Sequence, residues 1–271
     1  MKLSRLFSLR FWIEKKSKNW LNPIQTLFVN FYFLPFKQSV KFPIFVYGRV
    51  KFLSVRGGVV IKNDNVKRGM IKLNKTGLHP VNSGGPLEIA LEEGCEIVFH
   101  GNAVIHSGCR LQAFCSGSIV FGKEVYVSPQ TAIVSAGNIF LDDYVVVAHQ
   151  CQIFNTNFHY TVNVDSQKVA RNTKDVVIGQ HSWIGNRVTI TKGVVLPSYT
   201  IVASNSLVNK SLCTQDSCIV GGIPAKILSF GYRRVLNLEK ESFFNKWFSE
   251  NEADYFIMNE ISEQLFVRKV K

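Results

Sequence analysis

The chain has 271 residues, of which 46% are hydrophobic and 19% charged, a balance that suits a soluble globular protein with a substantial core. It has no apolar run long enough for a transmembrane helix, and residues 1–20 mix basic and apolar residues in a way that does not resemble a secretion signal. The formal net charge of +13 is uneven: residues 1–76 hold 16 Lys/Arg against 2 acids, and the remainder holds 16 against 17.

Residues 1–43 are predicted to form a basic, aromatic-rich segment that is helical or irregular, interrupted by Pro23, Pro35 and Pro43. Its charge favours contact with anionic lipid headgroups, at the periphery of a membrane, or with a phosphate-bearing acceptor. The alternative is a solvated basic face beside aromatic residues that pack onto the rest of the protein or onto a second subunit. No nucleic-acid-binding motif accompanies the charge, so nucleic acid is not an expected partner.

Residues 44–95 carry short apolar phrases such as Val59-Val60-Ile61 and are predicted to form irregular first coils of the domain that follows. Farther along, aliphatic residues recur every six positions, at Ile178, Ile184, Ile190, Leu196, Val202 and Val208. A period of six fits neither an α-helix nor a two-residue alternation. It is typical of a parallel β-helix, in which three phrases close one triangular coil.

The repeat extends upstream when short insertions are allowed, with equivalent positions at Phe99, Phe121, Leu141 and Ile178. The first two intervals are about one coil long, whereas the third contains roughly nineteen additional residues. We therefore predict a β-helix over residues 96–230 with one inserted loop at 154–177. His159 is the only histidine in that insertion.

Small or β-branched residues are expected at the tight corners of the coils, and Cys109, Cys115 and Cys151 occupy such positions. Cys95, Cys213 and Cys218 complete the set, and no pair has C-x-x-C or zinc-ligand spacing. We therefore expect free thiols that act as small hydrophobic residues, no metal site, and a reducing compartment, the cytoplasm.

Residues 231–271 are predicted to form a helical C-terminal extension. Its aromatic residues follow a helical stripe opposite Glu-rich positions, which favours a packing face over a ligand site. The stripe consists of Phe243, Phe244, Trp247 and Phe248.

Three stretches in this order resemble the hexapeptide-repeat acyltransferases, in the sugar and antibiotic O-acetyltransferase branch that includes maltose, galactoside and virginiamycin acetyltransferases. They are Asn155-Thr156-Asn157-Phe158-His159, Ile178-Gly179 through Trp183-Ile184-Gly185, and Gly222-Ile223-Pro224-Ala225-Lys226. The resemblance implies a mainly β fold, a left-handed parallel β-helix, assembled as a homotrimer. It also implies that acetyl-CoA lies in the groove between two β-helices, with a sugar or glycan acceptor at the same interface.

By this resemblance His159 is the general base, a role that suits imidazole because it titrates near neutrality. Relatives commonly place a carboxylate before the histidine, where this chain has Asn155 and Asn157. Asn157 is therefore the second catalytic candidate, since an amide oxygen can hold one imidazole tautomer, although a backbone carbonyl could do the same.

The donor groove is also inferred from the resemblance. Trp183 corresponds to an aromatic residue beside the acetyl-CoA arm, Asn186 and Ser204 to groups that hydrogen-bond the pantetheine, and Lys210 and Lys226 to partners of the CoA phosphates. The alternatives are plain packing for the tryptophan and solvated surface positions for the lysines. The other histidines, His79, His100, His106, His149 and His181, are expected to be structural or at the surface, with His149 the candidate for substrate contact.

The sequence thus predicts an acetyl-CoA-dependent O-acetyltransferase that acts on a sugar or glycan hydroxyl, in surface-polysaccharide biosynthesis. An N-acyltransferase acting on an amino-sugar and a non-catalytic trimeric scaffold remain as alternatives. A metalloenzyme of the γ-carbonic-anhydrase type is disfavoured, because the chain has no pair of histidines with that spacing.

Overall fold

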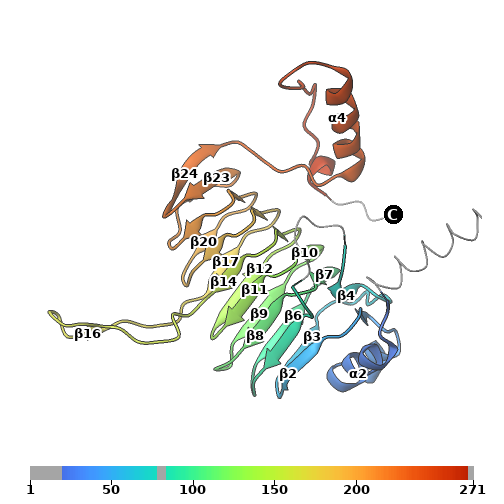
Figure 1. The fold of residues 1–271 in the computed structure, drawn as a ribbon, viewed down its shortest axis with the longest axis vertical. Coiled ribbons are helices and arrows are strands. Elements are labelled where there is room, and N and C mark those ends of the chain that lie inside the picture. Colours follow the sequence, from blue (N-terminus) through green and yellow to red (C-terminus); the bar gives the residue numbers. More distant parts are fainter. Residues whose placement is uncertain (1–19, 78–83, 268–271) are drawn as a thin grey trace, which may run out of the picture.

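The computed structural model describes residues 20–77 and 84–267, most of which form a column of short parallel strands with three sides (Figure 1). Each side is one sheet, of nine, seven and six strands. Successive strands along the chain belong to different sheets, so the chain passes around all three sides and then rises by one coil. This topology confirms the parallel β-helix predicted from the six-residue period.

The coils follow one another along the chain, and each of them except the last contributes one strand to every side. The strands are β1 Ile44–Val46, β2 Lys51–Val55, β3 Gly58–Ile61; β4 Ile71–Lys75, β5 Glu88–Leu91, β6 Glu96–Phe99; β7 Ala103–His106, β8 Arg110–Ala113, β9 Ser118–Phe121; β10 Val125–Val127, β11 Ala132–Ser135, β12 Asn138–Leu141; β13 Val146–Val147, β14 Gln152–Phe154, β17 Val176–Ile178; β18 Trp183–Ile184, β19 Thr189–Ile190, β20 Val195–Leu196; β21 Ile201–Val202 and β22 Leu207–Val208.

The apolar repeat positions stack directly above one another inside the column. Phe99 pairs with Phe121, Phe121 with Leu141, and Leu141 with Ile178. All four side chains are at most 2% exposed. Because strand side chains alternate between faces, one inward position per phrase is enough to set the register of the sheet.

The first coil is closed by a helix, α2 (Pro23–Phe33), which begins with Asn22 as N-cap and Pro23 in the first turn. Two of its polar side chains satisfy the free edge of β1: Thr26 Oγ1 accepts from the Val46 amide, and Asn30 bonds both the amide and the carbonyl of Ile44. The side chains thus occupy the place of a further strand, which protects an otherwise open sheet edge. A short helix, α3 (Phe36–Ser39), follows after Pro35.

The other end of the column finishes in an antiparallel pair, β23 (Cys218–Gly222) and β24 (Ala225–Phe230), added to the nine-stranded sheet. Cys213 and Cys218 form a disulfide at this end, so the expectation that these two are free thiols is wrong. Cys115 is exposed in a turn rather than buried at a corner, which corrects a second expectation; Cys95, Cys109 and Cys151 are free and buried.

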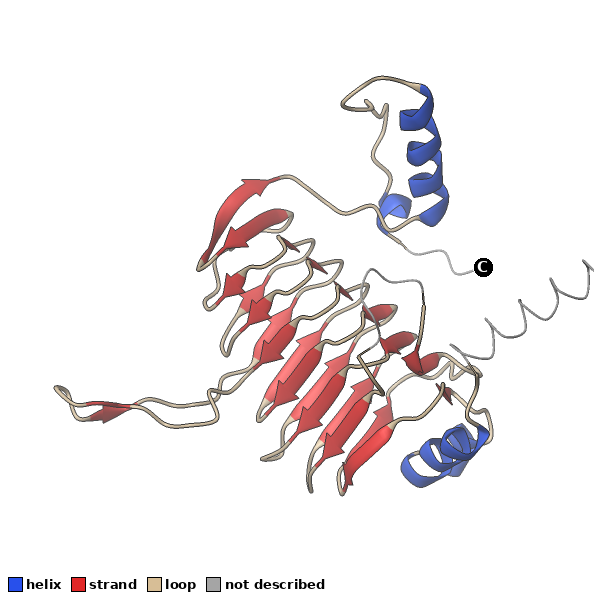
Figure 2. Cartoon of the chain, in the orientation of Figure 1, coloured by secondary structure: helices blue, strands red, loops and turns tan. Residues whose placement is uncertain are grey.

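The insertion leaves the column between β14 and β17 as a long hairpin that projects into solvent (Figure 2). Its two arms pair as β15 (Val162–Asn163) and β16 (Lys168–Val169), which are antiparallel.

The C-terminal extension is helical only in part, with α4 (Leu238–Glu250) and a 3₁₀ turn, η1 (Glu263–Phe266). The aromatic stripe of α4 packs against Phe256 of its own extension, whose ring lies 5.0 Å from that of Trp247. No residue of α4 is buried, so the stripe forms a local cluster. No helix within residues 20–77 and 84–267 is long and apolar enough to cross a membrane.

Candidate active site

The hairpin that carries His159 is anchored by a buried amide. Asn155 is fully buried; its Oδ1 accepts from the Ala136 amide at 2.7 Å and its Nδ2 donates to Ser135 Oγ at 2.9 Å. Its carbonyl also accepts from the Lys174 amide, where the chain returns to the column. Asn155 therefore joins both ends of the insertion to the neighbouring coil, and its amide is not free to orient an imidazole.

Beyond this anchor the chain turns sharply and presents His159 to solvent. Phe158 takes a left-handed backbone conformation (φ 62°), and its ring packs against Phe114 and Phe154 at 6.2 and 5.9 Å. The amide of His159 donates to the Asn157 carbonyl at 2.7 Å. Both His159 and Asn157 are exposed. Within the described residues no hydrogen bond holds the imidazole, which leaves its ring nitrogens open to a substrate.

The donor-groove candidates lie elsewhere on the column. Trp183 is on β18 in the nine-stranded sheet, 37% exposed, and Lys226 is on β24 of the same sheet. Asn186 and Ser204 stand one coil apart at the corner between the nine- and seven-stranded sheets, and Ser204 Oγ donates to Asn186 Oδ1. These four side chains therefore share one region, formed by an aromatic ring, two polar groups and a cation.

Sequence analysis missed one member of this region, Arg234. Its guanidinium lies 4.7 Å from the centre of the Trp183 ring, on the segment that leaves β24. A cation over an indole face is an attractive arrangement that also fixes both side chains. The signal that could have indicated it is the pair Arg233-Arg234, which follows two residues after the last strand of the column.

His159 and Lys210 fall at a different corner, between the seven- and six-stranded sheets. The hairpin joins β14 to β17 there, and Lys210 follows β22, two coils farther along. The seven-stranded sheet thus separates this pair from Trp183 and Lys226 on the nine-stranded sheet. One chain does not by itself bring all the predicted site residues to one place.

The buried thiols offer no second nucleophile. Burial raises the pKa of Cys109 to about 12 and that of Cys151 to about 11, so both remain protonated near neutral pH. His159 is the single histidine of the hairpin. Of the other histidines, His106 and His181 form ring contacts with tyrosines. His100 and His149 are half-buried, and His79 lies outside the described residues.

Comparison with known proteins finds relatives that are named as acetyltransferases. WbbJ of Escherichia coli K12, described as a lipopolysaccharide biosynthesis O-acetyl transferase, is 29% identical over 140 residues, covering 49% of this chain and 70% of WbbJ. The polysialic acid O-acetyltransferase of Neisseria meningitidis is 32% identical over 89 residues, covering 33% of this chain and 38% of that protein. No family model matches the chain.

Over up to about half of its length, the chain is thus similar in sequence to these O-acetyltransferases.

The solved structure of NeuO, a polySia-specific acetyltransferase, supports the same fold with a TM-score of 0.50 over 80% of this chain and 91% of NeuO, at 16% identity. The chain is accordingly a left-handed parallel β-helix, as the sequence predicts. The left-handed coil is an exception to the right-handed crossovers of most parallel sheets.

Proposed function

We propose that the protein transfers an acetyl group from acetyl-CoA to a hydroxyl group of a sugar in a surface polysaccharide or its precursor. The observation that carries this proposal is the exposed His159 on a firmly anchored hairpin, in a chain that is similar to two proteins named as O-acetyltransferases. An anchored base at the end of a protruding loop can reach a substrate held beside the column.

In this mechanism the His159 imidazole takes the proton of the acceptor hydroxyl as its oxygen attacks the thioester carbonyl carbon. The tetrahedral intermediate then collapses, the carbon–sulfur bond breaks, and the imidazolium returns the proton to the departing CoA sulfur. The products are the acetyl ester and CoA. The Asn157 carbonyl fixes the His159 backbone, and we assign to Asn157 the positioning of the base.

The donor would lie along the region of Trp183, Asn186, Ser204 and Lys226. An indole ring and an amide group suit contact with the pantetheine arm of acetyl-CoA. The charged side chains of Lys226 and Lys210 suit contact with the CoA phosphates. Because His159 emerges at another corner, we infer that the site forms between two copies of the chain, with the hairpin of one copy reaching the donor region of the next in a homotrimer.

Replacement of the base tests the proposed reaction. His159→Ala should lower kcat for acetyl transfer by at least about 10²-fold while leaving the melting temperature and the Kd for acetyl-CoA unchanged, as expected for loss of a general base. Tyr160→Ala, the neighbouring exposed position, is the matched control and should retain activity. Hydroxyl and amino-sugar acceptors assayed in parallel separate O- from N-acylation, and a fully active His159→Ala enzyme would refute the assignment.

We also propose a cytoplasmic location at the inner face of the membrane. Ile24 and Phe31 of α2 and Phe36 of α3 are exposed (77%, 46% and 74%), in the quarter of the sequence that holds the net positive charge. Such a surface suits an anionic bilayer. Wild type should co-sediment with anionic vesicles more strongly than Ile24→Ser/Phe36→Ser, and equal sedimentation of the two would exclude this surface.

A further inference from the structure

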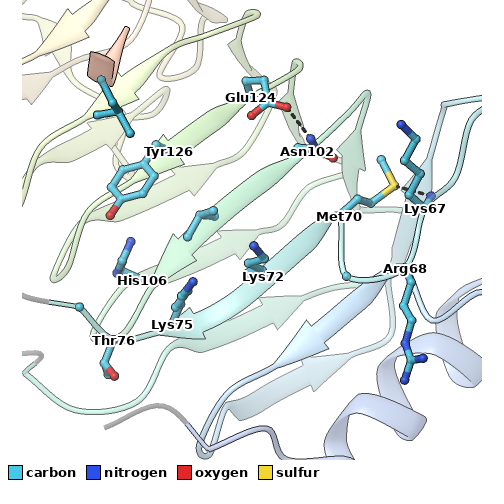
Figure 3. A pocket seen from close by; sticks show the side chains of 14 residues that line it. Lys67, Arg68, Met70, Lys72, Lys75, Thr76, Asn102, His106, Glu124 and Tyr126 are labelled. Atoms are coloured by element: carbon cyan, nitrogen blue, oxygen red, sulfur yellow. Dashed lines mark hydrogen bonds between the residues drawn. The ribbon is translucent and has the colours of Figure 1, made fainter. Parts of the chain in front are cut away.

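A cleft of about 550 Å³ lies on the outer face of the nine-stranded sheet, over β4, β7 and β10 (Figure 3). Its floor is a row of outward side chains in register, with Lys72 beside Val104 and Val104 beside Tyr126. Leu238, the first residue of α4, contributes to the lining. The volume is that of an ordinary small-ligand site.

The lining is strongly basic. It includes Lys67, Arg68, Lys72 and Lys75, whereas its only carboxylate, Glu124, accepts a hydrogen bond from Asn102. Within residues 20–77 and 84–267, none of the four cations belongs to an ion pair. Four positive charges, none of them ion-paired with a described acid, therefore line one concave surface that holds the single carboxylate of Glu124.

Lys72 and Lys75 are the central pair. Both are half-buried on β4, and Figure 3 shows them side by side above the sheet. Burial, and then the charge of Lys72, lowers the pKa of Lys75. Like charges held close together in a concave, partly desolvated surface attract anions, because a bound oxyanion relieves their repulsion.

The cleft lies on the same sheet as Trp183 and Lys226, nearer the N-terminal end of the column. A ligand in the cleft would therefore lie in line with a donor bound along that sheet. The aromatic floor at Tyr126 and the cations around it suit a sugar ring that bears oxyanions.

We propose that this cleft binds the acceptor and that the acceptor is an anionic glycan, with carboxylate or phosphate groups contacted by Lys72 and Lys75. The proposal rests on the proposed acetyl transfer and adds the substrate class to it. Arg68 and Lys67 extend the basic surface at the turn before β4, so the cleft can meet more than one negative charge of a chain.

Titration calorimetry with defined probes tests the proposal. Oligosialate and oligogalacturonate carry carboxylates, UDP-N-acetylglucosamine carries phosphates, and maltohexaose is neutral. Wild type should bind at least one anionic probe, with affinity that falls as salt increases, and should not bind maltohexaose. Preference between the carboxylate and phosphate probes identifies which oxyanion the cleft receives.

Lys72→Ala/Lys75→Ala should weaken that binding by about tenfold or more, with an unchanged melting temperature and unchanged acetyl-CoA affinity. Lys51→Ala is the matched control, because it removes one exposed positive charge from the seven-stranded sheet and should bind as wild type does. Lys72→Gln/Lys75→Gln, which keeps most of the side-chain length and its polarity but removes the charge, should behave like the alanine pair.

Equal binding of the anionic probes by wild type and both double variants would overturn the proposal, as would the absence of any anionic binding. His159-dependent acetylation of a neutral glycan alone would also overturn it while leaving the acetyl transfer intact. Conversely, charge-dependent binding in the cleft without acetyl-CoA binding would refute the proposed function and the acceptor role together.

Discussion

At the scale of single residues, two asparagines two positions apart have different surroundings. Asn155 is fully buried, and its side-chain amide forms hydrogen bonds with Ser135 and Ala136. Asn157 is exposed, and its backbone carbonyl accepts a hydrogen bond from the His159 amide. The first holds the hairpin on the column, and the second is near the base. The difference in solvent exposure separates the two roles, and it cannot be deduced from the sequence alone.

Asn155→Ala should lower the free energy of unfolding by about 1–3 kcal/mol, because it leaves the Ala136 amide without its partner. It should also lower kcat more than it changes the acetyl-CoA Kd, since the hairpin loses its anchor. Urea unfolding followed by circular dichroism measures the first effect. Asn157→Ala, at an exposed position, should change stability by no more than about 0.5 kcal/mol, and equal losses in the two variants would contradict the assigned anchor.

His159 itself could be identified from sequence, because it stands alone in the single long interruption of the repeat. The buried role of Asn155 could not, since the same motif permits an inward or an outward amide. The disulfide between Cys213 and Cys218 was missed for a related reason. Its cysteines flank an irregular segment after β22, where the six-residue phase no longer predicts which side chains approach one another.

At the scale of elements, a stack of rings runs along the corner between the six- and nine-stranded sheets. His181 lies between Tyr144 and Tyr199, with ring centres 4.6 Å apart on each side and nearly parallel planes. Its Nδ1 lies 2.9 Å from the Phe266 carbonyl, so the neutral ring can donate there and tie η1 to the column. Arg233 closes the stack at 3.9 Å from the Tyr199 ring centre.

The strands of the column were predictable because each phrase needs one inward aliphatic residue. The C-terminal extension was not, since the apolar stripe of α4 is satisfied by Phe256 from the same segment. An apolar stripe on a helix indicates that this face packs against another segment, but it does not identify that segment.

Burial lowers the pKa of His181 below its ordinary value of 6.5, and the charge of Arg233 lowers it further. The Phe266 carbonyl, Glu263 and Asp143 have smaller effects, which raise this pKa. The unfolded chain then binds more protons than the folded one at mildly acidic pH. The contribution of the neutral His181 ring to the free energy of unfolding should therefore be fully present above pH 6.5. It should be lost as the pH falls through the lowered pKa.

Urea midpoints measured from above pH 6.5 down to about pH 5 check this expectation. His181→Phe keeps a stacked ring without a titrating group and should reduce the pH dependence in that window. The protection of η1 amides from hydrogen exchange, corrected for the intrinsic rate at each pH, should decrease in wild type as the pH falls, because the protonated ring is disfavoured in its stack. A variant with an unchanged pH profile would show that other groups govern acid stability.

At the scale of the whole molecule, the column separates the parts of its proposed site. The hairpin with His159 leaves one corner, whereas Trp183, Lys226 and the basic cleft lie on the nine-stranded sheet beyond the intervening side. The proposed cyclic assembly would supply what one chain lacks, because each interface of a closed ring joins one corner of a subunit to a different face of the next. The capped edge at α2 prevents the alternative of end-to-end stacking.

Sedimentation should therefore give a mass of about three chains, and mixed assemblies should reveal shared sites. Co-expressed His159→Ala and Trp183→Ala/Lys226→Ala chains, each defective alone at low acetyl-CoA, should recover about a quarter of wild-type activity. This follows because one interface in four, on random assembly, pairs an intact hairpin with an intact donor region. Separately assembled defective proteins mixed afterwards should recover nothing. A fully active monomer, or mixed trimers without recovery, would place the whole site on a single chain.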